Sequence, residues 1–524
     1  AAEPLSALPL ARPVPPSLSR GFELHARQRL AAEADGSAWR SLLALLSDRN
    51  AHGSWRRIAL LAVLRADDAQ ALFGRLIPDL LDDDGGLLQE LIRTVMAVEV
   101  QPADALYAAL GVDVSGLTPG LTAPHGPTWS ILVGGVAALA ERLPAAAIPS
   151  VVDLYTQWLI VTLNVLKTSA ELVDQLYGWL VALDEAQGSP AAGHAIGRFA
   201  GLSREVRDAL HDNVRAAFVA FASAAPDLAR AYIATLRDGR RSSERAVSAV
   251  LFCGSLPQAA PTEYADLVAH LLIEPLDARH DRSGRRPEPF SFLDHRFLPE
   301  SPSQGPFLPL LRANPDAGLN LIRRLVDHEI AHDILRGQPA DASFAIGLGD
   351  GRRRVRAPWA YAYGRRQARG HAVGSALMAL EAWAHDRVEA GNDVGEVVDR
   401  LIGDPDVSAP FVLVAVDIIL SHWSDPAARR ALDLVASPEL LVLDRERQSR
   451  EMFSAIDMDW FGFGGLTKEP GKGRYTADAL RDHPSRKTTL ERTLGVYFAH
   501  IPSREILAAH YVGEIARLGE PPAH

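Results

Sequence analysis

The stretch GSAWRSLLALLSDRNAHGSWRRIALLAVL, residues 36–64, decides the fold class. Its apolar residues recur three and four positions apart in two successive runs, with a short polar segment between them. These residues are Trp39, Leu42, Leu43, Leu45 and Leu46, followed by Trp55, Ile58, Ala59, Leu61, Ala62 and Leu64. This spacing places each run on one face of a helix. The stretch therefore predicts two amphipathic α-helices joined by a turn.

The same spacing continues to about Glu274, and strand signals are scarce. The runs are roughly 12–20 residues long and are separated by Asp, Gly or Pro, as expected of helix ends. Short helices joined by short turns form αα-hairpins, and stacked hairpins form an α-solenoid. We predict an all-α fold, an irregular HEAT/TPR-like α-solenoid with proline-rich insertions. HEAT-like packing is favoured, because no strict period or TPR consensus is present.

Proline and glycine content predicts four segments along the chain. Residues 1–20 form a proline-rich N-terminal extension, and residues 21–274 form an N-terminal helical repeat region. Residues 275–315 form a proline- and arginine-rich insertion, and residues 316–524 form a C-terminal helical region. Within the last segment we expect loops near residues 337–370 and 460–485.

The composition is that of a globular protein, with 48% hydrophobic and 23% charged residues among 524. The net charge of -11 argues against a surface that binds nucleic acid throughout, although local basic patches remain compatible with it. Only four of the 54 basic residues are lysines, which indicates a GC-rich bacterial genome and gives arginine clusters less weight.

The single cysteine, Cys253, excludes an intrachain disulfide and any cysteine-based zinc or iron–sulfur cluster. We expect a protein of the reducing cytoplasm. The most apolar stretch, residues 148–166, contains Asp153, Gln157 and Asn164. It predicts a buried helix and not a membrane span, so no membrane partner is expected.

His328-Glu329-Ile330-Ala331-His332 has the form H-E-x-x-H. On a helix, His328 and His332 face the same way and could both bind Zn²⁺, with Glu329 as the general base of a metallopeptidase. A third ligand in a recognisable motif is missing; the nearer candidates are Asp333, Asp341, Asp350 and His371. The alternative is a structural helix without a cofactor, with an apolar stripe that includes Leu319, Ile322, Leu325, Val326, Ile330 and Ile334.

A second candidate site is a basic run without acidic residues. It contains Arg352, Arg353, Arg354, Arg356, Arg365, Arg366 and Arg369. The aromatic residues Trp359, Tyr361 and Tyr363 are interleaved with them. Arginine and aromatic side chains together can bind phosphate backbones and stack on bases, so the run predicts phosphate or nucleic-acid contact. The alternative is a solvated loop paired with acidic neighbours.

Several stretches resemble one bacterial family. They are FLPESPSQGPFLPLL at 297–311, NPDAGL at 314–319, SALMALEAW at 375–383, ASPEL at 436–440 and LDR at 443–445. Together they resemble the helical C-terminal region of very large bacterial ATP-binding proteins of the STAND type, some linked to antiphage defence of the AVAST kind. The resemblance covers roughly residues 290–450.

The resemblance implies a helical-repeat sensor that follows an ATPase domain, and it implies an architectural role for the helix of residues 316–335. No Walker motif is present in this chain. We therefore expect a binding or sensor scaffold that recognises a macromolecular partner, above all a protein, within a bacterial defence NTPase. A zinc metallopeptidase and a nucleic-acid-binding helical protein remain the alternatives.

Overall fold

The computed structural model describes residues 10–32, 36–48, 50–102, 122–124, 126–162, 168–187, 197–239, 244–276, 288–348, 351–365, 367–403, 405–460, 473–499 and 501–518. The chain forms two compact units, unit 1 (Ala1–Leu228) and unit 2 (Ala229–His524). This division comes earlier in the sequence than the boundary at 274/275 that proline content predicted.

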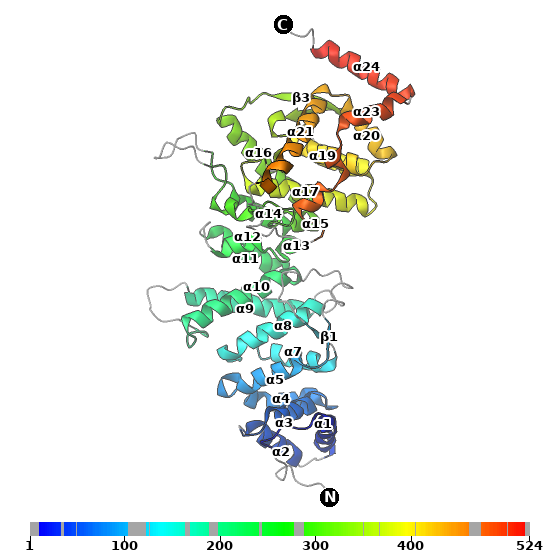
Figure 1. Ribbon diagram of the computed structural model, residues 1–524. Helices are drawn as coiled ribbons and strands as arrows, with labels where there is room; N and C mark the ends of the chain where they lie inside the picture. Colours follow the sequence, from blue (N-terminus) through cyan, green and yellow to red (C-terminus); the bar gives the residue numbers. More distant parts are fainter. Residues whose placement is uncertain are drawn as a thin grey trace. The chain divides into compact units, whose positions relative to one another are not determined.

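Unit 1 is mainly helical (Figure 1). Its α-helices are α1 (Pro16–Ala32), α2 (Ser37–Ser47), α3 (Gly53–Leu64), α4 (Ala69–Leu81), α5 (Gly86–Met96), α7 (Pro127–Ala137), α8 (Ile148–Thr162), α9 (Thr168–Gln187) and α10 (Arg204–Phe221). Short 3₁₀ turns are η2 (Asp83–Gly85), η3 (Ala145–Ala147) and η4 (Ala222–Ala224). Strands β1 (Val100–Pro102) and β2 (Thr122–Pro124) form an antiparallel pair.

The quoted stretch forms α2 and α3, as its spacing predicted. Helix α3 begins after His52, whose side chain accepts the backbone N–H of Ser54 and so satisfies one free donor of the first turn. Its residues from Ile58 to Leu64 are all buried, because α3 packs against α1, α2, α4, α5 and α7. The apolar stripe that predicted the helix is therefore also the core of this part of unit 1.

One described segment, Ala145–Thr162, is long and apolar enough to cross a membrane by length and composition alone. About half of it is buried within the protein. It ends in α8, whose Val151, Leu154 and Leu159 are fully buried core residues. A core helix passes the same test of length and composition, so the finding is weak evidence for a membrane span.

Unit 2 is also mainly helical and includes most of α11. Its α-helices are α11 (Pro226–Asp238), α12 (Glu244–Leu251), α13 (Leu256–Ala259), α14 (Pro261–Leu272), α15 (Phe307–Ala313), α16 (Pro315–Leu335), α17 (His371–Glu389), α18 (Val394–Ile402), α19 (Ala409–Ser421), α20 (Asp425–Val435), α21 (Pro438–Trp460), α22 (Ala477–Arg481), α23 (Leu490–Ala499) and α24 (Ile501–Leu518). Its 3₁₀ turns are η5 (Phe292–Phe297), η6 (Pro358–Ala360), η7 (Tyr363–Arg365) and η9 (Pro484–Lys487).

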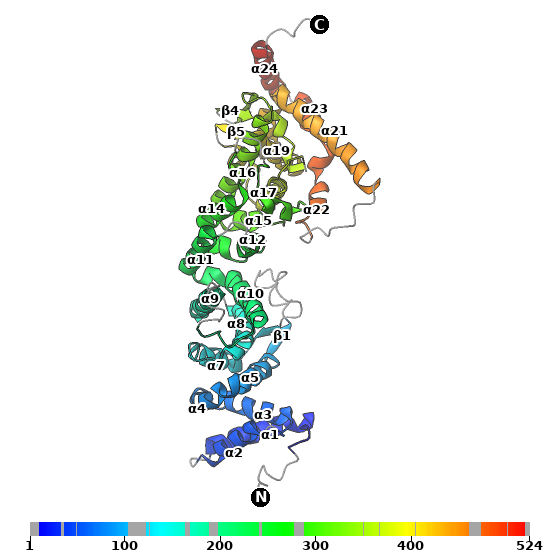
Figure 2. The same cartoon turned by 90° about the vertical axis from the view of Figure 1, so that its left-hand side faces the viewer.

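Two helices lie at the centre of unit 2 (Figure 2). In α19 every residue from Ala409 to Leu420 is buried, and in α17 every residue from Ala372 to His385 is buried. A helix that is apolar on all sides is typical of a protein core. Helix α17 packs against α15, α16, α19 and η7, so these elements are assembled around it.

A three-stranded sheet interrupts the helices of unit 2. Strand β3 (Ser343–Leu348) pairs antiparallel with β4 (Gly351–Arg356), and β4 pairs parallel with β5 (Asp406–Ser408). The all-α prediction is therefore right for most of the described chain and misses this sheet. The Arg-rich β4 has little apolar alternation; it is held by backbone pairing on both sides, and its Val355 is buried with Phe344 and Ile346 of β3.

The regions that were expected to be loops are partly built into unit 2. Residues 277–287 and 461–472 lie outside the described residues. The remainder of the expected insertion at 275–315 forms η5 and α15, with Phe290, Phe297 and Phe307 buried. The expected loop at 337–370 contains β3, β4, η6 and η7, and the one at 460–485 contains α22. Proline content marked irregular backbone here, and much of that backbone is well packed.

Candidate functional site

The H-E-x-x-H motif lies in the last two turns of α16. This helix starts at Pro315 behind Asn314, whose Oδ1 accepts the backbone N–H groups of Asp316 and Ala317, each at 3.1 Å. Along α16 the buried apolar stripe continues into polar residues, because Glu329, His332 and Asp333 are also buried. The motif is therefore part of the core of unit 2 and does not form a polar outer face.

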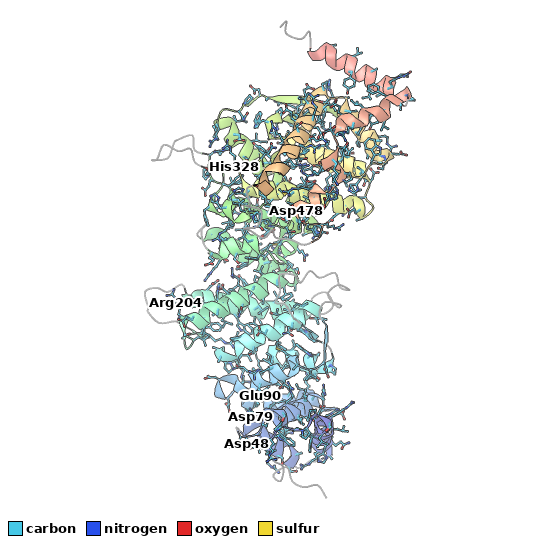
Figure 3. All side chains as sticks on the ribbon, in the orientation of Figure 1. Asp48, Asp79, Glu90, Arg204, His328 and Asp478 are labelled. Carbon is cyan, nitrogen blue, oxygen red and sulfur yellow. The ribbon has the colours of Figure 1, made fainter. Side chains whose placement is uncertain are left out.

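His328, labelled in Figure 3, makes a hydrogen bond to the backbone of a distant segment. Its Nε2 lies 2.8 Å from the carbonyl oxygen of Pro289, so Nε2 carries the proton and donates it. Its ring lies 5.5 Å from that of Phe290, and burial lowers the pKa of His328. One turn later His332 is buried, with 4% of its surface exposed. A nitrogen that donates to a carbonyl cannot at the same time bind a metal.

The Glu329 carboxylate holds the chain segment that leads into α17. It is fully buried and accepts the backbone N–H groups of Arg369 and Gly370. Burial raises the pKa of Glu329 to about 8, although these two N–H groups favour the charged form. A Cβ atom at Gly370 would lie 2.4 Å from the Phe290 ring, so only glycine allows this close approach.

Asp333, the residue after the motif, fixes the same segment through side chains. Its carboxylate accepts the Tyr363 hydroxyl and, at 3.1 Å, the Nε–H of Arg369. Burial and the neighbouring Asp333 raise the pKa of Tyr363, which therefore stays a hydroxyl donor. Glu329 and Asp333 thus attach Tyr363, Arg369 and Gly370 to α16.

These contacts do not fit a zinc site. Glu329 faces backbone amides, and the Nε2 of His328 is used by Pro289. Of the third-ligand candidates, Asp350 lies outside the described residues, and the Nδ1 of His371 lies 3.0 Å from Glu300. Within the described ranges no three His, Cys, Asp or Glu side chains are placed to hold a metal ion. The Glu329 carboxyl group is instead occupied by the backbone N–H groups of Arg369 and Gly370.

The residues of the basic run do not form one surface. Arg352, Arg353, Arg354 and Arg356 lie on β4, Arg369 precedes α17, and Arg366 lies outside the described residues. The guanidinium of Arg356 is 3.2 Å from Asp327 and 3.7 Å from Asp406. Arg354 also pairs with Asp406 on the adjacent strand, at the longer distance of 4.0 Å, so the two arginines share this carboxylate. Helix α16 and strand β5 thus supply acidic partners, Asp327 and Asp406, that the sequence places far away.

Arg365 lies in the core of unit 2. Its side chain is 4% exposed and pairs with Glu381, Asp417 and Glu451 from three helices. Burial alone would lower the pKa of Arg365, but these carboxylates raise it, so the guanidinium stays charged. In this position Arg365 cannot reach a phosphate in solvent.

Two further arginines extend this group of ion pairs, which we call the buried ionic network. Arg486 pairs with Glu381 at 2.6 Å and with Glu451 at 3.2 Å. Arg447 pairs with Asp444 at 3.0 Å and donates to the carbonyl of Thr488 at 3.1 Å. The network joins η7, α17, α19, α21 and η9. Charged groups this deep must be paired, because leaving water costs each of them several kcal/mol.

The two acidic residues beside Arg365 have opposite pKa shifts. Burial alone would raise the pKa of Glu381, but Arg486 and Arg365 hold it well below its usual range. Burial raises the pKa of Asp417 despite Arg365, with the Glu381 charge adding to the rise. Glu381 thus carries the negative charge, while Asp417 is the easier of the two to protonate.

Three histidines lie next to the network. The Nδ1 of His385 is 2.8 Å from the Nε2 of His422, and the His385 ring stacks on that of His483 at 3.7 Å. Burial and the neighbouring His385 lower the pKa of His422 and lower that of His483 to about 4. The cluster is thus held by one hydrogen bond between His385 and His422 and by ring stacking between His385 and His483.

A polar cavity of about 460 Å³ lies between α21 and residues 358–369. Helix α21 lines it with Leu443, Glu446, Arg447 and Arg450, whose spacing places them on one face of the helix. The opposite wall contains Trp359, Tyr363, Gln367 and Arg369, and Asp333 closes one end. The side chains of Arg369 and Arg450 are 51% and 60% exposed, so they form the rim.

Sequence reasoning found one wall of this cavity and missed the other. Trp359, Tyr363 and Arg369 belong to the basic run, but α21 contributed none of the candidate residues. The spacing of residues 443, 446, 447 and 450 was a readable signal for one helix face. No pattern in the sequence indicates which distant segment that face would meet.

Comparison with known proteins adds no assignment: no family model matches the chain, and no curated protein matches it.

Proposed function

We propose that this chain is a helical-repeat binding scaffold that recognises a macromolecular partner, above all a protein. The observation that carries the proposal is the order of packing in unit 1. There α3 packs on α4, α4 on α5, α5 on α8, and α8 and α9 on α10. Figure 1 shows α2 to α10 following one another in chain order. Contacts between near neighbours are the defining property of solenoids.

An irregular HEAT-like solenoid explains how unit 1 can bind a partner without a catalytic centre. Helices such as α4 and α10 bury one face on their neighbours and leave the other face to solvent, so several helices contribute to one continuous surface. The exposed positions differ from helix to helix, as the lack of a sequence period indicates. Specific recognition of one partner then depends on side chains spread over several helices.

The resemblance of residues 290–450 to STAND-type proteins supports a place beside an ATPase in a bacterial defence system. In such an arrangement this chain would supply the sensor, and ATP chemistry would belong to another domain. The two alternatives have less support. Glu329 and His328 are engaged in fold contacts, and Arg356 and Arg365 are paired with carboxylates.

Site-specific photo-crosslinking of the full chain in its native host tests the proposal. A benzophenone amino acid is placed singly at Arg57 on α3, Gln70 on α4, Glu171 on α9 or Arg204 on α10, all exposed positions. Because the surface of a scaffold spans several helices, we expect the same protein to be captured from at least two of these positions. Mass spectrometry of the crosslinked product identifies it.

Position 481, on α22 of unit 2, is the control, since Arg481 is also exposed. A partner captured from position 481 alone, or crosslinks to nucleic acid alone from unit 1, would reject the protein-binding scaffold. Cleavage of the captured protein near the crosslink would instead favour a peptidase.

A further inference from the structure

We propose that the cavity between α21 and residues 358–369 binds a small carboxylate that carries a planar apolar group. This inference is independent of the proposed scaffold function, because every residue in it belongs to unit 2. Its volume of about 460 Å³ is within the range of small-molecule sites, roughly 300–1,000 Å³. The ligand is deduced from what lines the rim, the walls and the base.

The base and walls are rigid. Arg447 is buried at the base and is held by Asp444 at 3.0 Å and by Glu451 at 2.9 Å. The Tyr361 hydroxyl lies 3.4 Å from the same Asp444 carboxylate. The opposite wall is attached to α16, because Glu329 binds the backbone N–H of Arg369. A site whose groups are fixed before binding loses little entropy when a ligand enters.

The rim offers hydrogen-bond donors from two separate elements. Arg369 uses its Nε for Asp333, and its two Nη atoms bond to no other side chain among the described residues. The Nη1 of Arg450 donates to Gln367 at 3.2 Å, and its Nη2 is 3.6 Å from Glu446. Both guanidinium groups keep N–H donors for a further acceptor, and their planar shape matches a carboxylate.

The charge at the rim favours one negative charge over two. Asp333 and Glu446 lie beside Arg369 and Arg450, and Arg447 is paired with Asp444 and Glu451, so the lining has no surplus of positive charge. The N–H donors of the two rim arginines can compensate the single charge of a carboxylate, whereas a phosphate dianion brings two charges. Recognition would therefore rest on directed hydrogen bonds from the two arginines.

Apolar side chains on both walls suit a flat group. They are Pro358, Trp359, Ala362 and Leu443. A flat ring would lie against the Trp359 indole, and aromatic pairs in offset or edge contact gain about 0.5–1.5 kcal/mol beyond simple burial. Such a ligand can be a free aromatic acid or the C-terminal carboxylate of a peptide that ends in an aromatic residue.

Calorimetric titration of the full chain with matched acid and amide pairs tests the proposal. The probes are benzoylglycine with its amide, and the peptide Ala-Ala-Phe with its C-terminal amide; phenyl phosphate is the third arm. We expect an acid to bind with Kd below about 1 mM and its amide at least ~10-fold more weakly, because the lost hydrogen bonds are charge-assisted. The tighter acid identifies the source of the carboxylate.

Arg369→Gln and Arg450→Gln should each weaken the acid at least ~10-fold. Both side chains are more than half exposed, so unchanged melting temperatures should show that the fold is intact. Arg481→Gln, an exposed arginine that does not line the cavity, is the control and should bind as the wild type does.

Four results would overturn the proposal. They are equal affinity for acid and amide, tighter binding of phenyl phosphate, wild-type affinity in both rim variants, and no binding of either acid below about 1 mM. The acid and amide comparison uses only the wild-type chain, so it decides the matter even where a variant is unstable.

Discussion

Units 1 and 2 have similar helices but bury different kinds of side chain. The buried polar side chains among the described residues of unit 1 are Thr94, Thr128, Thr162, Ser169 and His211. The buried polar side chains among the described residues of unit 2 include carboxyl and guanidinium groups, which cost more to bury: Asp294, Glu300, Glu329, Asp333, Glu381, Asp417, Asp444 and Arg447. Unit 1 is thus held mainly by apolar contacts between neighbours, whereas unit 2 also depends on charges paired over long distances in sequence.

The difference shows which part of the fold follows from local pattern. Apolar burial is non-directional and contributes about 25 cal/mol per Å² wherever a stripe meets another stripe. A buried ion pair is different, because it stabilises only when every partner is in place and strongly destabilises when one is removed. The buried ionic network should therefore make unit 2 sensitive to single charge deletions that unit 1 tolerates.

Arg365→Ala should have the largest effect. It leaves Glu381, Asp417 and Glu451 without their shared cation, and such a deletion costs roughly 3–5 kcal/mol. Hydrogen exchange measured over peptides of each unit should be faster than in the wild type in unit 2 and unchanged in unit 1. Arg204→Ala, in an exposed pair with Asp208 3.7 Å away, is the control and should cost no more than about 1 kcal/mol. Equal effects of the two deletions would contradict the distinction between the units.

Truncation of a core leucine should affect both units alike. Leu159 on α8 and Leu380 on α17 are both fully buried. Each change to alanine removes apolar surface and leaves a cavity, at a cost of about 2–5 kcal/mol. Urea unfolding followed by hydrogen exchange should show a lower free energy of unfolding in unit 1 for Leu159→Ala. A comparable decrease should occur in unit 2 for Leu380→Ala. A loss in only one unit would mean that the units also differ in apolar packing.

Glu329→Ala should have an intermediate effect, confined to unit 2. It leaves the backbone N–H groups of Arg369 and Gly370 without their acceptor, which costs roughly 1–3 kcal/mol. The rate of hydrogen exchange at these two amides should increase more than at other amides of unit 2. Glu329→Gln keeps an acceptor oxygen and should lose much less.

Zinc chelation tests whether Glu329 and His328 have a structural role or belong to a zinc site. Because Glu329 and His328 serve the fold, we expect a chelator to leave the melting temperature unchanged and the purified chain to lack stoichiometric zinc. Stoichiometric zinc that is lost in a His328→Ala, His332→Ala double variant would contradict the structural role and restore the metallopeptidase.

The sequence predicted the helices well because each depends on its own apolar spacing. Ala62 and Leu64 of α3 are buried as the stripe required. The same reasoning could not place β4, since Arg352 and Arg354 show no apolar alternation and the strand depends on pairing with Ala345 and Asp406. Strand pairing is a contact between distant residues, and spacing within one segment does not encode it.

The candidate sites were harder to predict for the same physical reason. H-E-x-x-H gives the correct helix face, but the partners of that face, Pro289 and Gly370, are about 40 residues away in either direction. Arg365 and Arg369 lie four positions apart in sequence, yet one is buried among three carboxylates and the other is half exposed at the cavity rim. A cluster of arginines in sequence therefore says little about which of them face solvent.

The most specific effect concerns pH and separates Glu329 from the other ionisable groups. Its pKa is raised from 4.5 to about 8 in the folded chain, so between these values the folded state holds a proton that the unfolded state has released. Stability from this group is therefore fully present below pH 4.5 and is lost as pH rises towards 8. His483, with its pKa lowered to about 4, acts in the opposite sense, because its contribution to stability is lost as pH falls below 6.5.

Denaturation of unit 2 at several pH values tests the role of Glu329. The free energy of unfolding should decline less between pH 5 and 8 in Glu329→Gln than in the wild type, while that of unit 1 is the same in both. An identical pH profile in the variant would mean that the two backbone N–H groups outweigh burial and keep Glu329 ionised.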